Sequence, residues 1–271
     1  MKNKLETHWP SLINLHAFNK IYEAELIFWT IVTLIIVLII YTKQYYLLGF
    51  LYILHITCVF LHHHKSKEIT SSSKINYKQL KQQLKTGDLI LFRTNNHYDL
   101  ANFYIYVALP LIYDKQYMYS HIGLVYKENG RIYLIESTAE PHKDIYGKMK
   151  SGIRMMPIEQ RIKNYDGIIA YKSCKKDLQS SLPKIKKTIN PIYHSPWGLG
   201  IISQYQSICK LDTIIDDHQY IKKNGLGCMP FIMALLQKIG HIKPSQSHMW
   251  SNLAASKCKL GLYHDAKMVI S

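Results

Sequence analysis

Residues 119–138 read YSHIGLVYKENGRIYLIEST, and this stretch predicts a β-hairpin in the middle of the chain. Two runs of β-branched and aromatic residues flank Asn129–Gly130, a dipeptide that strongly favours a two-residue hairpin turn. With that turn, Gly123 lies opposite Glu136, and residues that face each other share one side of the sheet. His121 and Glu136 are then diagonal neighbours on the same side, within reach of each other's side chains.

This pair of side chains indicates a possible chemistry. A carboxylate at Glu136 can accept an N–H from the His121 ring, fix its tautomer and stabilise the imidazolium. A histidine in a strand is more often a packed core residue, so the pair needs a third partner before it points to catalysis.

The third partner is a cysteine at the start of an expected helix. Residues 224–240 read NGLGCMPFIMALLQKIG, which predicts a helix that begins near Cys228 and stops at the last glycine. Pro230 fits only in the first turn of that helix. The helix dipole there favours a thiolate at Cys228, and the free backbone N–H groups can hold an oxyanion. We expect Gly225 and Gly227 to leave room for a substrate beside the sulfur.

The other cysteines lack this context. Cys58 lies in an apolar segment, and Cys174, Cys209 and Cys258 lie in basic or loop-like stretches. Five cysteines in a reducing compartment do not indicate a disulfide framework.

Four motifs in this order resemble the circularly permuted NlpC/P60 group of papain-like thiol hydrolases. They are GDLILF (87–92), SHIGLVY (120–126), LIEST (134–138) and the late Gly-Cys at a helix start. The match is closest to the branch with glutamate as third residue, which includes YiiX/YaeF-like amidases and poxvirus relatives. It covers residues 80–175 and 220–241.

The resemblance implies an α+β fold, an antiparallel sheet with helices. It also implies a Cys228 nucleophile, a His121 general base and acid, and a Glu136 that orients His121. Cys228 N–H would help to hold the oxyanion. One departure is Met229, where a small hydroxyl residue often follows the nucleophile.

The N-terminal region is expected to be a membrane anchor. Residues 26–42 and 44–64 carry no charge apart from the intervening Lys43, which favours two short spans. The alternatives are one span with an interfacial segment, and a soluble apolar hairpin. Basic flanks place both ends in the cytosol by the positive-inside rule. The expected layout is a cytosolic segment (1–25), two short transmembrane helices (26–64), a linker (65–76) and the catalytic domain (77–271).

Composition limits the partners. The chain of 271 residues has 34 Lys+Arg and 18 Asp+Glu, a formal charge of +16, and 48% hydrophobic residues, which excludes a disordered polyelectrolyte. The basic charge indicates an anionic partner. Only four basic residues are arginines, which disfavours base readout in DNA. Three adjacent histidines at 62–64 cannot converge on one ion, and we expect neither a metal nor a cofactor.

Three functions therefore remain open. The first is a membrane-anchored cysteine amidase, peptidase, lipid acyl hydrolase or acyltransferase, with a thioester intermediate and an amide or ester substrate of lipid or peptide type. The second is a catalytically inactive membrane or virion structural protein with the same fold. The third is a basic nucleic-acid-binding membrane protein, for which no binding motif is present. The poxvirus branch adds a virion or host membrane to the expected locations.

Overall fold

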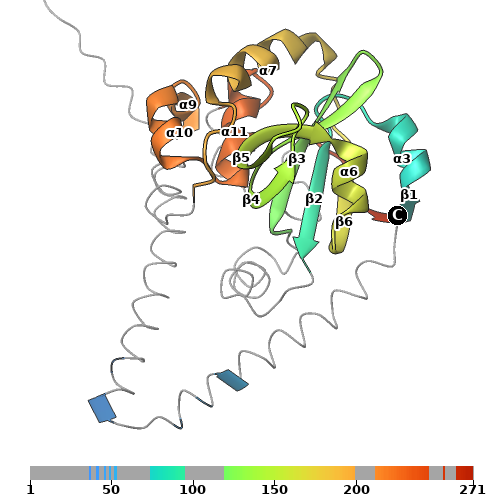
Figure 1. Ribbon diagram of the computed structural model, residues 1–271. Coiled ribbons are helices and arrows are strands. Elements are labelled where there is room, and N and C mark those ends of the chain that lie inside the picture. Colours follow the sequence, from blue (N-terminus) through green and yellow to red (C-terminus); the bar gives the residue numbers. More distant parts are fainter. Residues whose placement is uncertain are drawn as a thin grey trace, which may run out of the picture.

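The computed structural model describes residues 74–94, 119–198, 211–243 and 261–270, together with isolated positions between 37 and 53 and at 253. Its centre is a seven-stranded sheet with helices on both faces (Figure 1). The strand order is β1-β7-β6-β2-β3-β4-β5, and every neighbouring pair is antiparallel except β1 and β7. The strands are β1 (Lys74–Asn76), β2 (Leu89–Thr94), β3 (His121–Glu128), β4 (Arg131–Lys143), β5 (Met149–Pro157), β6 (Gly167–Lys172) and β7 (Lys267–Ile270).

The central hairpin has the predicted register. Glu128 pairs with Arg131, and Gly123 pairs with Glu136. Asn129 and Gly130 both have positive φ, 51° and 74°, as a two-residue turn of this twist requires. The period of two in the side chains therefore places every residue of β3 and β4 on the expected face.

The sheet buries both faces because its strands alternate between two apolar cores. In β2, Leu89 and Leu91 belong to the core under α7, α9, α10 and α11, whereas Ile90 and Phe92 belong to the core under α3 and α6. Figure 1 shows these two groups of helices on opposite sides of the sheet. The helices are α3 (Tyr77–Gln83), α6 (Ile158–Lys163), α7 (Leu182–Ile189), α9 (Leu211–Ile214), α10 (His218–Asn224) and α11 (Cys228–Lys238), with short 3-10 turns at Gln179–Ser181 and Asn190–Ile192.

Helix α11 is the most deeply buried of these elements. Residues 229–236 are all buried, and Phe231 and Leu235 are fully enclosed. Enclosing a side chain of that size stabilises the fold by about 2 kcal/mol. The helix begins at Cys228 and its chain reverses at Gly240, where φ is +80°. Both ends are where the sequence predicts them.

The sheet differs from the prediction at its edge. Lys74–Asn76, assigned to the linker from the sequence, form β1 and pair in parallel with β7. The folded unit therefore starts before residue 77, and the sheet is mixed rather than wholly antiparallel. A three-residue strand is too short to show an alternating pattern, and its partner lies at the far end of the chain.

The expected membrane spans (26–64) and the N-terminal segment (1–25) lie outside the described residues apart from isolated positions. In the described part of the chain, no helix is both long enough and apolar enough to cross a bilayer.

Candidate functional site

His121 and Glu136 meet on the face of the sheet that α6 covers. His121 is the first residue of β3, and its Nε2 lies 2.6 Å from Oε2 of Glu136 in β4. The Glu136 side chain is 0% exposed and the His121 side chain is 14% exposed. The diagonal relation deduced from the hairpin register therefore becomes a direct hydrogen bond.

Cys228 reaches the same place from the other side of the sheet. It is the first residue of α11, and its sulfur lies 3.9 Å from the carbonyl oxygen of Ser120, the residue before His121. The thiol is partly exposed. Gly227 is the N-cap, and no described side chain caps the first turn. Because first-turn N–H groups have no partner inside a helix, those of this turn are available to an oxygen beside the sulfur.

One hydrogen bond fixes the approach of α11 to the sheet. The hydroxyl of Ser137 donates to the carbonyl of Leu226 at 2.5 Å, and both residues are buried. Ser137 follows Glu136 in β4 and points to the opposite face. Adjacent residues of one strand therefore hold the His121 ring and the loop that leads to Cys228.

The His121 ring is poised to carry a proton. Burial disfavours its charged form, but hydrogen bonds and charge interactions with Cys228 and Glu136 outweigh this and raise the pKa of His121 to about 9. Nε2 is engaged by Glu136, which leaves Nδ1 for the thiol. The structure thus places all three side chains proposed from the sequence near one another, with Cys228 beside the residue that precedes His121.

Two buried arginines surround Glu136. Arg154 donates to Oε1 from Nη2 at 2.7 Å and from Nε at 3.3 Å, and Arg161 Nε lies 3.4 Å from Oε2. Burial disfavours the carboxylate, but the hydrogen bond to His121 and the charges of His121 and both arginines outweigh it. Together they hold the pKa of Glu136 well below its usual range.

Aromatic rings and backbone carbonyls hold the arginines in place. The Arg161 guanidinium lies 4.7 Å from the centre of the Phe92 ring and 5.1 Å from that of Tyr165. Its Nη1 contacts Glu140 Oε2 at 3.2 Å. Sequence reasoning missed both arginines, although one signal was available. For Arg154 the signal is an arginine within an apolar strand of a chain whose cations are nearly all lysines, because such a residue indicates a buried anion. Arg161 lies in α6 and carries no such signal.

The sequence predicts that Gly225 leaves room for a substrate, but its surroundings indicate a different role. Its φ is +72°, and a Cβ added there would lie 2.2 Å from the carbonyl oxygen of Pro196. The backbone of residues 196–198 therefore packs directly against Gly225. Such a close approach of two chain segments requires glycine because it leaves no space for a side chain. Gly227 is buried and has ordinary extended dihedral angles, with φ −68° and ψ 165°.

A second cysteine–histidine pair lies on the same side of the sheet as α11. The sulfur of Cys174 is 3.3 Å from His241 Nε2, but Cys174 is 0% exposed. Cys58, Cys209 and Cys258 fall outside the described residues.

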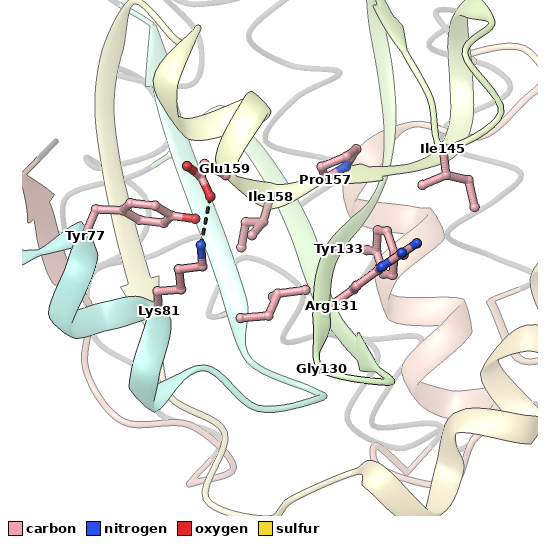
Figure 2. Close-up of a pocket in the computed structure, with 10 residues that line it drawn as sticks. Tyr77, Lys81, Gly130, Arg131, Tyr133, Ile145, Pro157, Ile158 and Glu159 are labelled. Carbon is pink, nitrogen blue, oxygen red and sulfur yellow. Dashed lines mark hydrogen bonds and ion pairs between the residues drawn. The ribbon is translucent and has the colours of Figure 1, made fainter.

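A surface cavity of about 400 Å³ lies away from these residues, between α3, the β3–β4 turn and the start of α6 (Figure 2). Lys81 and Glu159, which form an exposed ion pair 2.8 Å long, both line it, and none of the three candidate catalytic residues does. Among the described residues, no cluster of histidine, cysteine and acidic side chains could hold a metal ion.

The fold and the site together define a mixed α+β protein with a thiol at a helix start, close to an imidazole that is hydrogen-bonded to a buried carboxylate. No family model matches the chain. Over 141 residues it is 26% identical to an uncharacterized protein of Acanthamoeba polyphaga mimivirus. The match covers 48% of this chain and 56% of that viral protein, so the chain spans little more than half of the relative's length.

Proposed function

We propose that the protein is a cysteine-dependent acyl hydrolase, amidase or acyltransferase of the circularly permuted NlpC/P60 type. One observation carries the proposal: a partly exposed thiol at a helix N-terminus beside a histidine that is hydrogen-bonded to a buried glutamate. This arrangement supports nucleophilic catalysis because each group has a separate task.

In the proposed reaction, His121 holds the proton of the Cys228 thiol, and the sulfur attacks the carbonyl carbon of an ester or amide to give a tetrahedral intermediate. A His121 whose pKa is about 9 carries a proton at neutral pH, so it donates that proton to the leaving group as the tetrahedral intermediate collapses. A thioester on Cys228 remains. His121 then takes a proton from water or from a second nucleophile, which attacks the thioester and releases an acid or a transferred acyl product. N–H groups of the first turn of α11 stabilise the oxyanion in both steps.

Glu136 is a positioning residue in this scheme. Arg154 and Arg161 keep it ionised and fixed, and it in turn orients the His121 ring. In the described part of the chain both guanidinium groups contact Glu136 rather than the sulfur of Cys228, so their effect on the reaction passes through Glu136.

We further propose a lipid-linked substrate and a membrane location. The apolar residues 26–64, with Lys43 as their only charged residue, and the excess of lysine both support attachment to an anionic membrane. The similarity to a mimivirus protein supports a viral source.

Selective alkylation tests the proposal. The detergent-solubilised full chain is treated with a low dose of iodoacetamide near pH 6, and each modified cysteine is mapped by mass spectrometry. We expect Cys228 to react first, because the imidazolium of His121 favours its thiolate. The H121A variant should lose that selectivity, and H241A should retain it.

The buried Cys174 reports on folding in the same experiment. If Cys174 becomes labelled in H121A, that variant is partly unfolded, and the experiment is repeated with H121Q. Equal labelling of all accessible cysteines in the folded wild-type protein would overturn the proposal.

A further inference from the structure

The turn between β4 and β5 carries features that the candidate site does not use. We define the β4–β5 tip as residues 143–150, sequence KDIYGKMK. Asp144 is buried beneath it and accepts N–H bonds from Tyr146 and Lys148, both at 2.9 Å. The other oxygen of Asp144 lies 2.5 Å from His194 Nε2. These contacts fix the backbone of the tip, so its outward side chains are held in place.

Three large apolar side chains project from this fixed turn. Tyr146 is 65% exposed, Met149 is 63% exposed and Ile145 is 37% exposed. Several such side chains within five residues form a concentrated apolar surface, which usually marks an interaction site. Figure 2 shows Ile145 at the edge of the surface cavity, beside Tyr133.

The exposed charged side chains of the tip are all lysines. Lys143, Lys148 and Lys150 are exposed, and the only acidic residue of the tip is the buried Asp144. Within the described ranges, no ion pair involves these three lysines. The nearest exposed carboxylate along β4, Glu140, is already paired with His142 and Arg161.

We infer that the β4–β5 tip docks on an anionic lipid bilayer. Tyrosine and aliphatic side chains suit the interfacial layer of a membrane, and a rim of lysines attracts acidic headgroups. A projecting convex turn suits a bilayer surface better than it suits the groove of a folded partner. The inference goes beyond the proposed function, because it holds whether or not Cys228 reacts with a lipid.

Arg154 joins the tip to the candidate site. Its Nη1 donates to the carbonyls of Glu140 and Lys150, at 2.9 and 2.6 Å, on the two strands that lead into the tip. Its Nη2 donates to Glu136 at 2.7 Å. A bilayer that holds the tip would therefore lie at a fixed position relative to Glu136 and His121.

Vesicle binding tests the inference with the full chain. The protein is held in neutral phosphatidylcholine nanodiscs, which accommodate the apolar residues 26–64, and vesicles with or without phosphatidylserine are then added. We expect co-sedimentation with the anionic vesicles only. The K148Q/K150Q variant should bind about twenty-five-fold more weakly, since each lysine near an anionic surface contributes about fivefold.

Two further variants separate the tip from the overall charge. I145S/Y146S/M149S should also lose binding, although its net charge is unchanged. K175Q/K176Q removes two exposed lysines after β6 and should bind like the wild type. Equal weakening by both lysine variants, or full binding by the apolar variant, would overturn the inference. Self-association of the chain that the apolar variant abolishes would instead assign the tip to a second copy, and would also overturn it.

Discussion

Two cysteine–histidine pairs in the described part of the chain differ in exposure, in hydrogen-bond partners and in the direction in which the pKa of the histidine is shifted. Cys228 is partly exposed at the start of α11, and its partner His121 is hydrogen-bonded to Glu136. Cys174 is fully buried, and the partner of its sulfur is His241. Burial raises the pKa of the Cys174 thiol, and burial together with the charge of Lys176 lowers the pKa of His241.

The difference shows what a cysteine and a histidine need in addition to proximity. In the Cys174 pair, burial favours the neutral forms of both groups, so the two side chains contribute to the packing of the core. In the first pair, the interactions of His121 with Cys228 and with the buried Glu136 carboxylate outweigh burial and favour the imidazolium. The Cys174 pair therefore serves as an internal control for every test of the first.

The largest expected effect separates the two thiols. On a 4-nitrophenyl fatty acyl ester, C228A should lower turnover by about four orders of magnitude or more, because it removes the nucleophile. C174A should leave turnover unchanged. Release of nitrophenolate measures both. Similar loss in the two variants, with both folded, would remove the distinction between the pairs.

Loss of the carboxylate should be the next largest effect. E136Q leaves the charges of Arg154 and Arg161 buried without their anion, which should lower the free energy of unfolding by about 3–5 kcal/mol. Urea denaturation measures the change. E159Q, which breaks an exposed ion pair with Lys81, is the matched control and should leave stability unchanged. An E136Q variant as stable as the wild type would show that Glu136 does not hold the arginines.

A smaller effect should distinguish two glycines. Gly225 lies three residues before Cys228, and Gly240 lies directly before His241. G225A forces a side chain against the backbone of Pro196 and should cost about 3 kcal/mol. G240A meets nothing within 4 Å, so only its positive φ is strained, at about 1 kcal/mol. Thermal unfolding compares the two. G225A should also slow Cys228 alkylation in the protein that remains folded, whereas G240A should not. Equal costs would contradict the close approach of residues 196–198.

The last expected difference lies in the pH dependence of stability, and it is small over any single pH unit. Because the pKa of His121 is raised from 6.5 to about 9, its contribution to stability is complete below pH 6.5 and is lost as pH rises through 9. The slope over that range is at most about 1.4 kcal/mol per pH unit. For His241, with a lowered pKa, stability falls as pH drops below 6.5. Proton NMR titration, assigned with H121Q and H241Q, should give midpoints on opposite sides of 6.5. Two midpoints on the same side would contradict the comparison.

The sequence predicted those parts of the site that depend on residues close to one another along the chain. The Asn129–Gly130 turn set the hairpin register and thereby the His121–Glu136 pair, and Pro230 set the start of α11. Long-range contacts were not accessible in this way. Arg161 reaches Glu136 from α6, and Gly225 faces Pro196, a residue on a separate loop.

The edge of the sheet illustrates the same limit. β1 acquires its partner from the last described residues of the chain, so nothing near Lys74–Asn76 indicates a strand. The proposed anchor at residues 26–64 stays a prediction.

The two hydrogen bonds from adjacent residues of β4 have a consequence for assembly. Glu136 holds His121 on one face, and Ser137 holds Leu226, and with it Cys228, on the other. A slip of β4 by one residue would exchange the faces of these two side chains and break both attachments together. Chains with misregistered strands would thus lack the proposed site altogether, so any activity that depends on this site would report only correctly paired molecules.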